Sequence, residues 1–237
     1  MAGSRSSDSG RGIGCGRDHN QKEDFQIMKK RSIIKITSTL LIICGILLVL
    51  GAAALFVKVS NDDAKAKAFS QEIVSRLKDE TPEAATSPSE KSADAGESTV
   101  DRVVSEDGET LAVIDNVNYL GYLSFVGYDV TLPVFADWSF EALNYAPARY
   151  SGTVKDNDLV IAAHNYYSHF FLLNEMVEGN EVDLTQADGS IIRYIVKKVE
   201  TLEPTELNKL TAGEYDLTLF TCTPTGRARA TVRCNKI

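Results

Sequence analysis

Hydrophobic and polar positions divide the chain into four segments. Residues 1–35 are polar, basic and rich in Gly and Ser at their start, which predicts a disordered tail. Residues 36–57 form an apolar run without a charged side chain, and residues 58–108 are again mostly polar. Residues 109–237 contain short runs of apolar and β-branched residues. The pattern predicts a tail, a membrane-spanning helix, a stalk and one folded domain.

The apolar run has the length of a transmembrane helix. Its 22 residues would extend about 33 Å as a helix, enough to cross a hydrocarbon core of about 30 Å. Lys29, Lys30, Arg31 and Lys35 precede it, which predicts a cytoplasmic N-terminus. The alternative is a cleaved signal peptide, whose apolar region normally spans only about 7–15 residues. We therefore expect a retained signal anchor in the cell membrane, with the folded domain outside the cell.

Residues 58–108 predict a helix followed by a flexible stalk. Within Ala64–Lys78, apolar residues recur at four-residue spacing, which is typical of a helix; they are Phe69, Ile73 and Leu77. The stretch Asp79–Thr99 carries six acidic residues and two prolines but no large apolar side chain. Because such a composition cannot bury a core, we expect this stretch to remain flexible.

The last segment predicts a mostly β domain. Asp188 and Gly189 lie between two apolar runs, as in a hairpin turn. Two short helices fit Ser139–Leu143 and His169–Met176. Seven runs fit strands and together favour a β-barrel or sandwich: Tyr119–Val126, Val130–Phe135, Leu159–Ala163, Glu181–Leu184, Ile191–Val199, Leu217–Cys222 and Arg229–Cys234.

Charge is distributed as unevenly as hydrophobicity. Residues 1–35 hold eight basic and four acidic side chains, a net charge of +4. Because the whole chain carries −8 and the apolar run carries none, the remainder carries −12. An acidic domain of this kind argues against a nucleic-acid partner.

Membrane topology restricts the residues that could form an extracellular catalytic site. Cys15 lies in the tail and Cys44 in the apolar run, which leaves Cys222 and Cys234 as candidate nucleophiles. A disulfide between these two would be the default expectation for a pair of extracellular cysteines. The hairpin that they predict argues against it.

The two C-terminal strand runs predict that Cys222 faces an arginine. If residues 223–228 form the connecting loop, Cys222 stands opposite Arg229, with Cβ atoms about 5 Å apart. Cys234 then pairs near Leu217, about 17 Å from Cys222 along the hairpin. Because a disulfide needs Cα atoms within about 7 Å, we expect no bridge and interpret Cys234 as a core residue.

A thiol, a guanidinium and an imidazole together would suit acyl transfer. An adjacent cation lowers the pKa of a thiol and can stabilise an oxyanion. A histidine can protonate a leaving amine and then act as a base. Since His19 lies in the tail, His164 and His169 are the candidates. Residue types alone do not exclude the simpler interpretation that Cys222 is a core residue.

Local motifs resemble those of the sortases, membrane-bound transpeptidases of Gram-positive bacteria. Thr218–Cys222 (TLFTC) matches the TLxTC signature of that family. Leu159–Asn165 (LVIAAHN) is similar to the strand that ends in the family's active-site histidine, and Arg229 corresponds to the arginine of the following strand. Further similarity lies in residues 119–123, 132–134 and 148–152.

The resemblance implies a closed eight-stranded β-barrel with short helices and assigns a role to each matching residue. Cys222 would be the nucleophile, His164 the acid and base, and Arg229 the residue that stabilises the substrate carbonyl and oxyanion. Thr221 and Asn165 would contribute to substrate binding. The resemblance implies no cofactor, and we see no acidic cluster that demands a metal.

Two of these assignments have alternatives. His169, five residues after His164, could be the catalytic histidine instead. Because the loop after the catalytic cysteine is short here, Arg227 and Arg233 also remain possible holders of the role given to Arg229.

The activity implied is cleavage of an LPxTG-type sorting signal on surface proteins through a cysteine thioester. The acyl group would pass to an amine of a cell-wall precursor (the lipid II cross-bridge) or to a pilin lysine. The single N-terminal anchor and the end of the chain at Ile237 favour a cell-wall anchoring enzyme of B- or D-like class over a pilin-polymerising one. A membrane-anchored cysteine protease and a non-catalytic binding module are the alternatives.

Overall fold

The computed structural model describes residues 17–79, 100–211 and 213–237. Contacts within the chain divide it into two units, residues 1–58 and residues 59–237. The first unit contains the greater part of a long helix, and the second contains the end of that helix and the whole sheet.

The first unit is helical from its first described residue onward. Helix α1 spans Arg17–Asp79, so the prediction of a disordered tail is wrong for residues 17–35. These residues contain neither Gly nor Pro and are rich in good helix formers, which explains the difference. The rest of the tail, residues 1–16, lies outside the described residues.

The apolar run lies within α1. Among the described residues, one helix is long and apolar enough to cross a membrane by length and composition; it spans Thr37–Asp79 and has a mean hydropathy of 3.0 in its most apolar window. None of that window is buried within the protein. This long apolar helix indicates a membrane anchor, as the sequence predicts.

The last part of α1 belongs to the second unit and packs against the sheet. Ile73 and Leu77 are only 3% and 5% exposed, in a cluster that includes Phe135. The ring of Phe69 lies 5.9 Å from that of Phe135. The predicted helix over Ala64–Lys78 is therefore confirmed, but its apolar face covers the folded domain.

A short hairpin precedes the barrel. Strands β1 (Asp101–Val104) and β2 (Thr110–Ile114) pair antiparallel, so folded structure begins before residue 109, where the sequence analysis starts the domain. All four residues of β1 are exposed, which explains why the hydrophobic pattern does not reveal this strand. The remainder of the predicted stalk, residues 80–99, lies outside the described residues.

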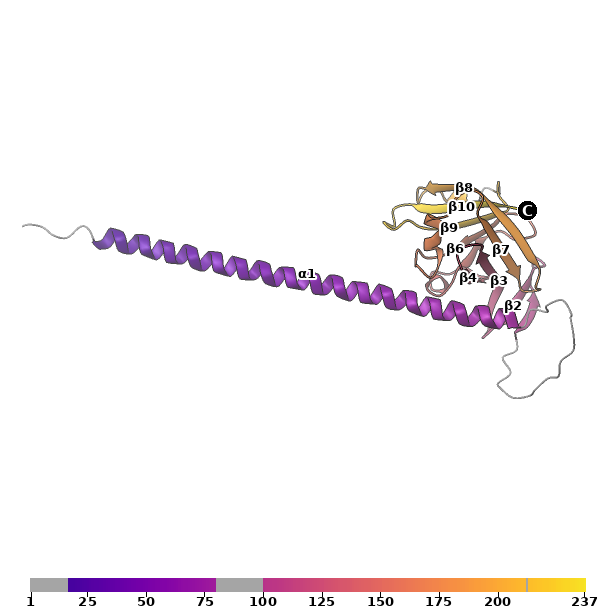
Figure 1. The fold of residues 1–237 in the computed structure, drawn as a ribbon, viewed down its shortest axis with the longest axis horizontal. Coiled ribbons are helices and arrows are strands. Elements are labelled where there is room, and N and C mark those ends of the chain that lie inside the picture. Colours follow the sequence, from indigo (N-terminus) through magenta and orange to yellow (C-terminus); the bar gives the residue numbers. More distant parts are fainter. Residues whose placement is uncertain (1–16, 80–99, 212) are drawn as a thin grey trace, which may run out of the picture. The chain divides into compact units, whose positions relative to one another are not determined.

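Eight strands close into a barrel, as the resemblance implies (Figure 1). Their order is β3-β4-β5-β6-β9-β10-β8-β7, and β7 pairs back onto β3. All seven predicted strand runs are confirmed, and β5 is the one barrel strand among the described residues that the pattern misses. The strands are β3 (Val117–Phe125), β4 (Val130–Phe135), β5 (Ala148–Ser151), β6 (Leu159–Ala162), β7 (Glu181–Gln186), β8 (Ile191–Leu202), β9 (Leu217–Cys222) and β10 (Arg229–Lys236).

Closure of the barrel requires a glycine in β3. Gly121 pairs with both β4 and β7 and has a φ of +138°. A Cβ atom at this position would lie 1.9 Å from the carbonyl oxygen of Thr185 on β7. The close approach of the two strands therefore depends on the absence of a side chain.

Three short helical turns connect the strands. The predicted helices are present as single 3₁₀ turns, η1 (Ala142–Asn144) and η2 (Phe170–Asn174), and a third turn, α2 (Leu207–Leu210), precedes β9. The predicted turn at Asp188 and Gly189 joins β7 to β8, with the Gly189 N–H donating to the Gln186 carbonyl at 3.0 Å.

Candidate active site

Three strand ends meet at one end of the barrel. Strands β6 and β9 are parallel, so both finish there, and β10 is antiparallel to β9, so it begins there (Figure 1). Cys222 is the last residue of β9 and Arg229 the first of β10, and the two are register partners. The predicted pairing is thus confirmed. Cys234 pairs with Leu217 at the other end of the hairpin, also as predicted.

The register of β6 and β9 brings His164 to the same place. Paired residues run from Leu159 with Leu217 to Ala162 with Phe220. Beyond β6, the Ala163 N–H donates to the Phe220 carbonyl at 3.3 Å, so the two segments stay joined. If the register is continued by two residues beyond the end of β6, the position of His164 corresponds to that of Cys222.

The alternation of side chains places the three residues on the outer face of the barrel. Leu217 and Leu219 of β9 belong to the interior cluster, whereas Phe220 packs in the outer cluster. Cys222 has the parity of Phe220, and Arg229 shares the face of its register partner. On β6 the outer residues are Val160 and Ala162, and the same alternation carried to His164 directs its side chain outward.

The two cysteines of the barrel lie in different environments. Cys222 is half-buried, and Cys234 is fully buried in the interior cluster. Burial raises the pKa of the Cys234 thiol to about 12. Both thiols are free. Cys234 is therefore a core residue, as the hairpin register predicts.

The two histidines also differ. The His164 side chain is half-buried, and burial lowers its pKa below the usual value. His169 is fully buried, and its Nε2 lies 3.0 Å from the Tyr145 carbonyl oxygen. Burial lowers the pKa of His169 to about 4. A buried, hydrogen-bonded imidazole cannot reach a substrate, so the geometry favours His164 over His169 as the acid and base.

The three arginines of the region have different partners. Arg233 is 4% exposed, and its guanidinium binds Glu200 and Thr218 as well as two carbonyl groups near α2. These contacts commit it to a structural role. Arg227 lies exposed in the loop between β9 and β10. Arg229 is half-buried beside Cys222, and its Nη1 donates to the Ala228 carbonyl at 3.1 Å.

Thr221, to which the resemblance assigns substrate binding, lies on the opposite face of β9 from Cys222. Its side chain points into the barrel, is 1% exposed, and donates from Oγ1 to the Ala163 carbonyl at 2.9 Å. This bond ties the residue before Cys222 to the residue before His164. Asn165, the other predicted binding residue, is half-buried, and its Oδ1 accepts a hydrogen bond from Asn174 at 3.0 Å.

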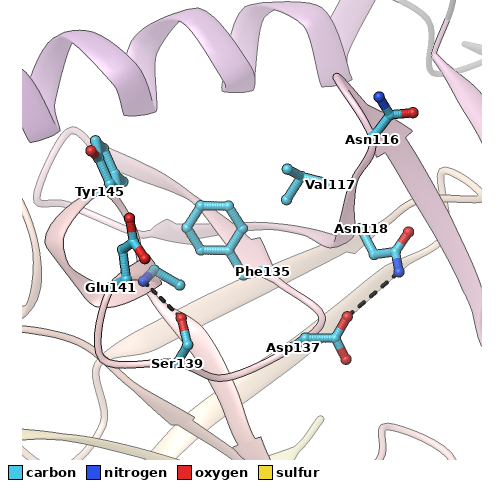
Figure 2. A pocket seen from close by; sticks show the side chains of 9 residues that line it. Asn116, Val117, Asn118, Phe135, Asp137, Ser139, Glu141 and Tyr145 are labelled. Atoms are coloured by element: carbon cyan, nitrogen blue, oxygen red, sulfur yellow. Dashed lines mark hydrogen bonds between the residues drawn. The ribbon is translucent and has the colours of Figure 1, made fainter.

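A pocket beside α1 contains none of the predicted site residues. Figure 2 shows it between the turn after β2 and the segment around η1, with Phe135 at its centre. Asn118 and Asp137 meet at its edge at 3.5 Å. The described residues include no group of three or more His, Cys, Asp or Glu side chains placed to hold a metal ion.

Asp63 of α1 belongs to no sequence motif, although this residue contacts the loop after His164. Asp63 binds Ser168 through its carboxylate, 105 residues further along the chain. Nothing in the local pattern marks this residue, because its partner comes close only in the folded domain.

A thiol, an imidazole and a guanidinium at one end of a closed barrel define a candidate site for cysteine-dependent acyl transfer. Residues 126–237 match the family model described as the sortase domain. These residues therefore form a sortase domain.

Several solved structures are similar to this chain. Sortase C from Clostridium perfringens, in complex with the C-terminal cell wall sorting motif, is 22% identical, with 50% of this chain and 70% of that chain covered and a TM-score of 0.45. Sortase C of Streptococcus pneumoniae is 23% identical, with 50% of this chain and 68% of that chain covered and a TM-score of 0.44. Sortase A of Corynebacterium diphtheriae is 24% identical, with 51% of this chain and 61% of that chain covered and a TM-score of 0.44. No curated protein matches the chain in sequence.

Proposed function

We propose that this sortase domain is a cysteine transpeptidase with Cys222 as nucleophile, His164 as acid and base, and Arg229 as oxyanion stabiliser. The proposal is supported by the pairing of Cys222 with Arg229 and by the register of β6 with β9, which ends two residues before His164 and Cys222, within a domain that matches the sortase family model. Arg233 and His169 are held in buried hydrogen bonds, which supports Arg229 and His164.

The acylation step follows from the properties of these groups. Because burial lowers the pKa of His164, its imidazole favours the neutral form, which accepts the Cys222 proton. The thiolate attacks the scissile carbonyl, and Arg229 stabilises the negative charge that develops on oxygen. When the C–N bond breaks, the imidazolium donates its proton to the leaving amine, and a thioester remains on Cys222.

The transfer step is the reverse of acylation, with a different amine. An incoming amine attacks the thioester carbonyl and loses a proton to His164. The C–S bond then breaks, and the Cys222 thiolate leaves and regains its proton. The net result replaces one amide by another without consuming a cofactor.

The substrates proposed are those that the family resemblance implies. The acyl donor is an LPxTG-type sorting signal on a surface protein, and the acceptor is the amine of a peptidoglycan precursor or a pilin lysine. The basic residues before the apolar run support an orientation with the N-terminus in the cytoplasm and the barrel outside the cell.

The test uses the full chain in detergent or nanodiscs with an LPxTG-type peptide, with and without an amine such as triglycine. Mass spectrometry should detect a thioester on the peptide that contains Cys222 and an amine-dependent product. Cys222→Ala should abolish both. Cys234→Ala is the matched control, because it removes a buried thiol from the opposite face of the same hairpin, and it should keep the activity of any fraction that folds.

The two alternatives give different results in the same assay. A cysteine protease would form the thioester but yield only hydrolysed peptide with every amine tried. A non-catalytic module would form no thioester, and peptide binding would survive the loss of Cys222.

A further inference from the structure

The loop that carries His164 is a compact unit. The Phe170 N–H donates to the His164 carbonyl at 3.3 Å, and the His169 N–H donates to the Tyr166 carbonyl at 3.0 Å. The rings of His164 and Tyr166 lie 5.0 Å apart. Because these contacts link both ends of the loop, we expect a shift at Ser168 to move His164.

Helix α1 holds this loop at Ser168. The Asp63 carboxylate oxygen Oδ1 accepts hydrogen bonds from the Ser168 N–H at 2.9 Å and from Ser168 Oγ at 2.7 Å. Ser168 Oγ also lies 3.2 Å from the Asp63 carbonyl oxygen. Hydrogen bonds to a charged carboxylate are stronger than those between neutral groups, so this contact fixes the loop firmly.

A second contact supports the same loop from the same helix. The Nε2 of His169 donates to the Tyr145 carbonyl at 3.0 Å, and the Tyr145 ring packs against Phe69 of α1 at 5.4 Å. Figure 2 shows Tyr145 beneath the helix. Ser70 of α1 approaches the same carbonyl at 3.5 Å. The helix thus contacts the loop directly at Ser168 and, about two turns further along, indirectly through Tyr145.

We propose that Asp63 is a positioning residue that orients His164 for catalysis through its hydrogen bonds to Ser168. The inference rests on the proposed function, since it assigns Asp63 to the acid and base of that reaction. It also makes the helix that follows the membrane anchor a working part of the active site, in addition to its role as a tether.

The test compares three variants of the full chain in nanodiscs. Asp63→Ala removes the acceptor, whereas Asp63→Asn removes the charge but keeps an oxygen that accepts both hydrogen bonds. Asp62→Ala is the matched control: it removes a neighbouring carboxylate that also raises the pKa of Tyr166 but makes no hydrogen bond to the loop within the described residues.

The expected result is a split between kcat and KM. Misplacement of a catalytic group by about 1 Å can cost about 100-fold in rate, so Asp63→Ala should lower kcat by about 10- to 100-fold, with KM changed less than twofold. Asp63→Asn should recover most of the rate, and Asp62→Ala should match the unmodified chain. Rates are measured well below the Tm of each variant, so that loss of folded protein does not contribute.

A second readout does not depend on turnover. In protein labelled at histidine, NMR should show the His164 pKa rising toward its ordinary value in Asp63→Ala, because the released loop exposes the ring to water. Asp63→Asn and Asp62→Ala should leave it unchanged. His19 and His169 are distinguished by substitution.

The outcomes separate the inference from the proposed function. Equal kcat and equal His164 titration in the Asp63→Ala and Asp62→Ala chains would overturn the positioning role, whether or not the protein is active. An inactive unmodified chain whose His164 titration still depends on Asp63 would refute the transpeptidase proposal and keep the positioning contact.

Discussion

Cys222 and Cys234 belong to one hairpin, yet they should differ greatly in reactivity toward alkylating agents. The thiolate is the reactive form of cysteine, and an ordinary thiol has a pKa of about 8.5. Burial raises the pKa of Cys234 to about 12. At pH 8, only about 1 in 10,000 molecules would carry a Cys234 thiolate, compared with about one in four for an ordinary thiol.

Ionisation alone therefore predicts that Cys234 reacts about 2,500-fold more slowly than an ordinary accessible thiol. Its side chain is also 0% exposed, so a reagent cannot reach the sulfur without opening the barrel. Cys222 is half-buried at a strand end and has no such barrier. We expect Cys222 to be alkylated within minutes under conditions that leave Cys234 intact for hours.

The assay treats the full chain in detergent with iodoacetamide at pH 8 and follows each cysteine by peptide mass spectrometry. Cys15 and Cys44 fall in separate peptides and do not interfere. Urea is the control, because unfolding should bring Cys222 and Cys234 to similar rates. Comparable alkylation of both thiols in the folded protein would contradict the burial and register on which the site assignment depends.

Three other expectations rest on single contacts. Thr221→Val leaves the buried Ala163 carbonyl without its hydroxyl donor, so it should lower the free energy of unfolding, measured in urea, by about 1–3 kcal/mol. Thr231→Val is the control and should change that free energy little, because the Thr231 hydroxyl makes only a long hydrogen bond of 3.4 Å. Gly121→Ala should abolish cooperative melting, because its Cβ would lie 1.9 Å from the Thr185 carbonyl oxygen. Stability should fall between about pH 6.5 and pH 4 by up to about 1.4 kcal/mol per unit, because unfolded chains protonate His169 first.

Each of these has a contrary outcome. Equal unfolding midpoints for the two threonine variants would show that the Thr221 hydroxyl is dispensable. A normal melt of Gly121→Ala would show that the barrel closes less tightly at that point. If His169→Gln keeps the same slope of stability against pH, another group is responsible for it.

Local pairing in the hairpin is predictable from the sequence because loop length fixes register. Once residues 223–228 form the loop, Cys222 must face Arg229 and Cys234 must face away. The interior–exterior alternation then follows from parity. Hence the thiol and the guanidinium can be paired without any knowledge of the rest of the fold.

The contact of β6 with β9 has no comparable local signal. His164 and Cys222 are 58 residues apart, and the hydrophobic pattern does not say which strands neighbour each other in a closed sheet. Their association in the sequence analysis comes from the family resemblance. Strand β5, which lies between β4 and β6, is missed because its four residues are too few for a clear alternation.

The sequence predicts the apolar face of α1 but not the surface on which that face packs. The spacing of Phe69, Ile73 and Leu77 predicts an apolar helix face, and the structure confirms it. The same pattern fits a helix that packs on any apolar surface, so the partner is not determined. The contact of Asp63 could not be predicted either, because a single carboxylate in a polar stretch belongs to no periodic pattern.

These differences bear on how the site is held together. The thiol and the guanidinium are fixed by a six-residue loop, whereas the imidazole is fixed by contacts between distant segments. Thr221 links the two parts, since its hydroxyl joins the strand of Cys222 to the residue before His164. Asp63 holds the same histidine loop from its other end. Thr221→Val and Asp63→Ala should therefore displace His164 while Cys222 and Arg229 stay paired, so that thiol alkylation survives and acyl transfer slows.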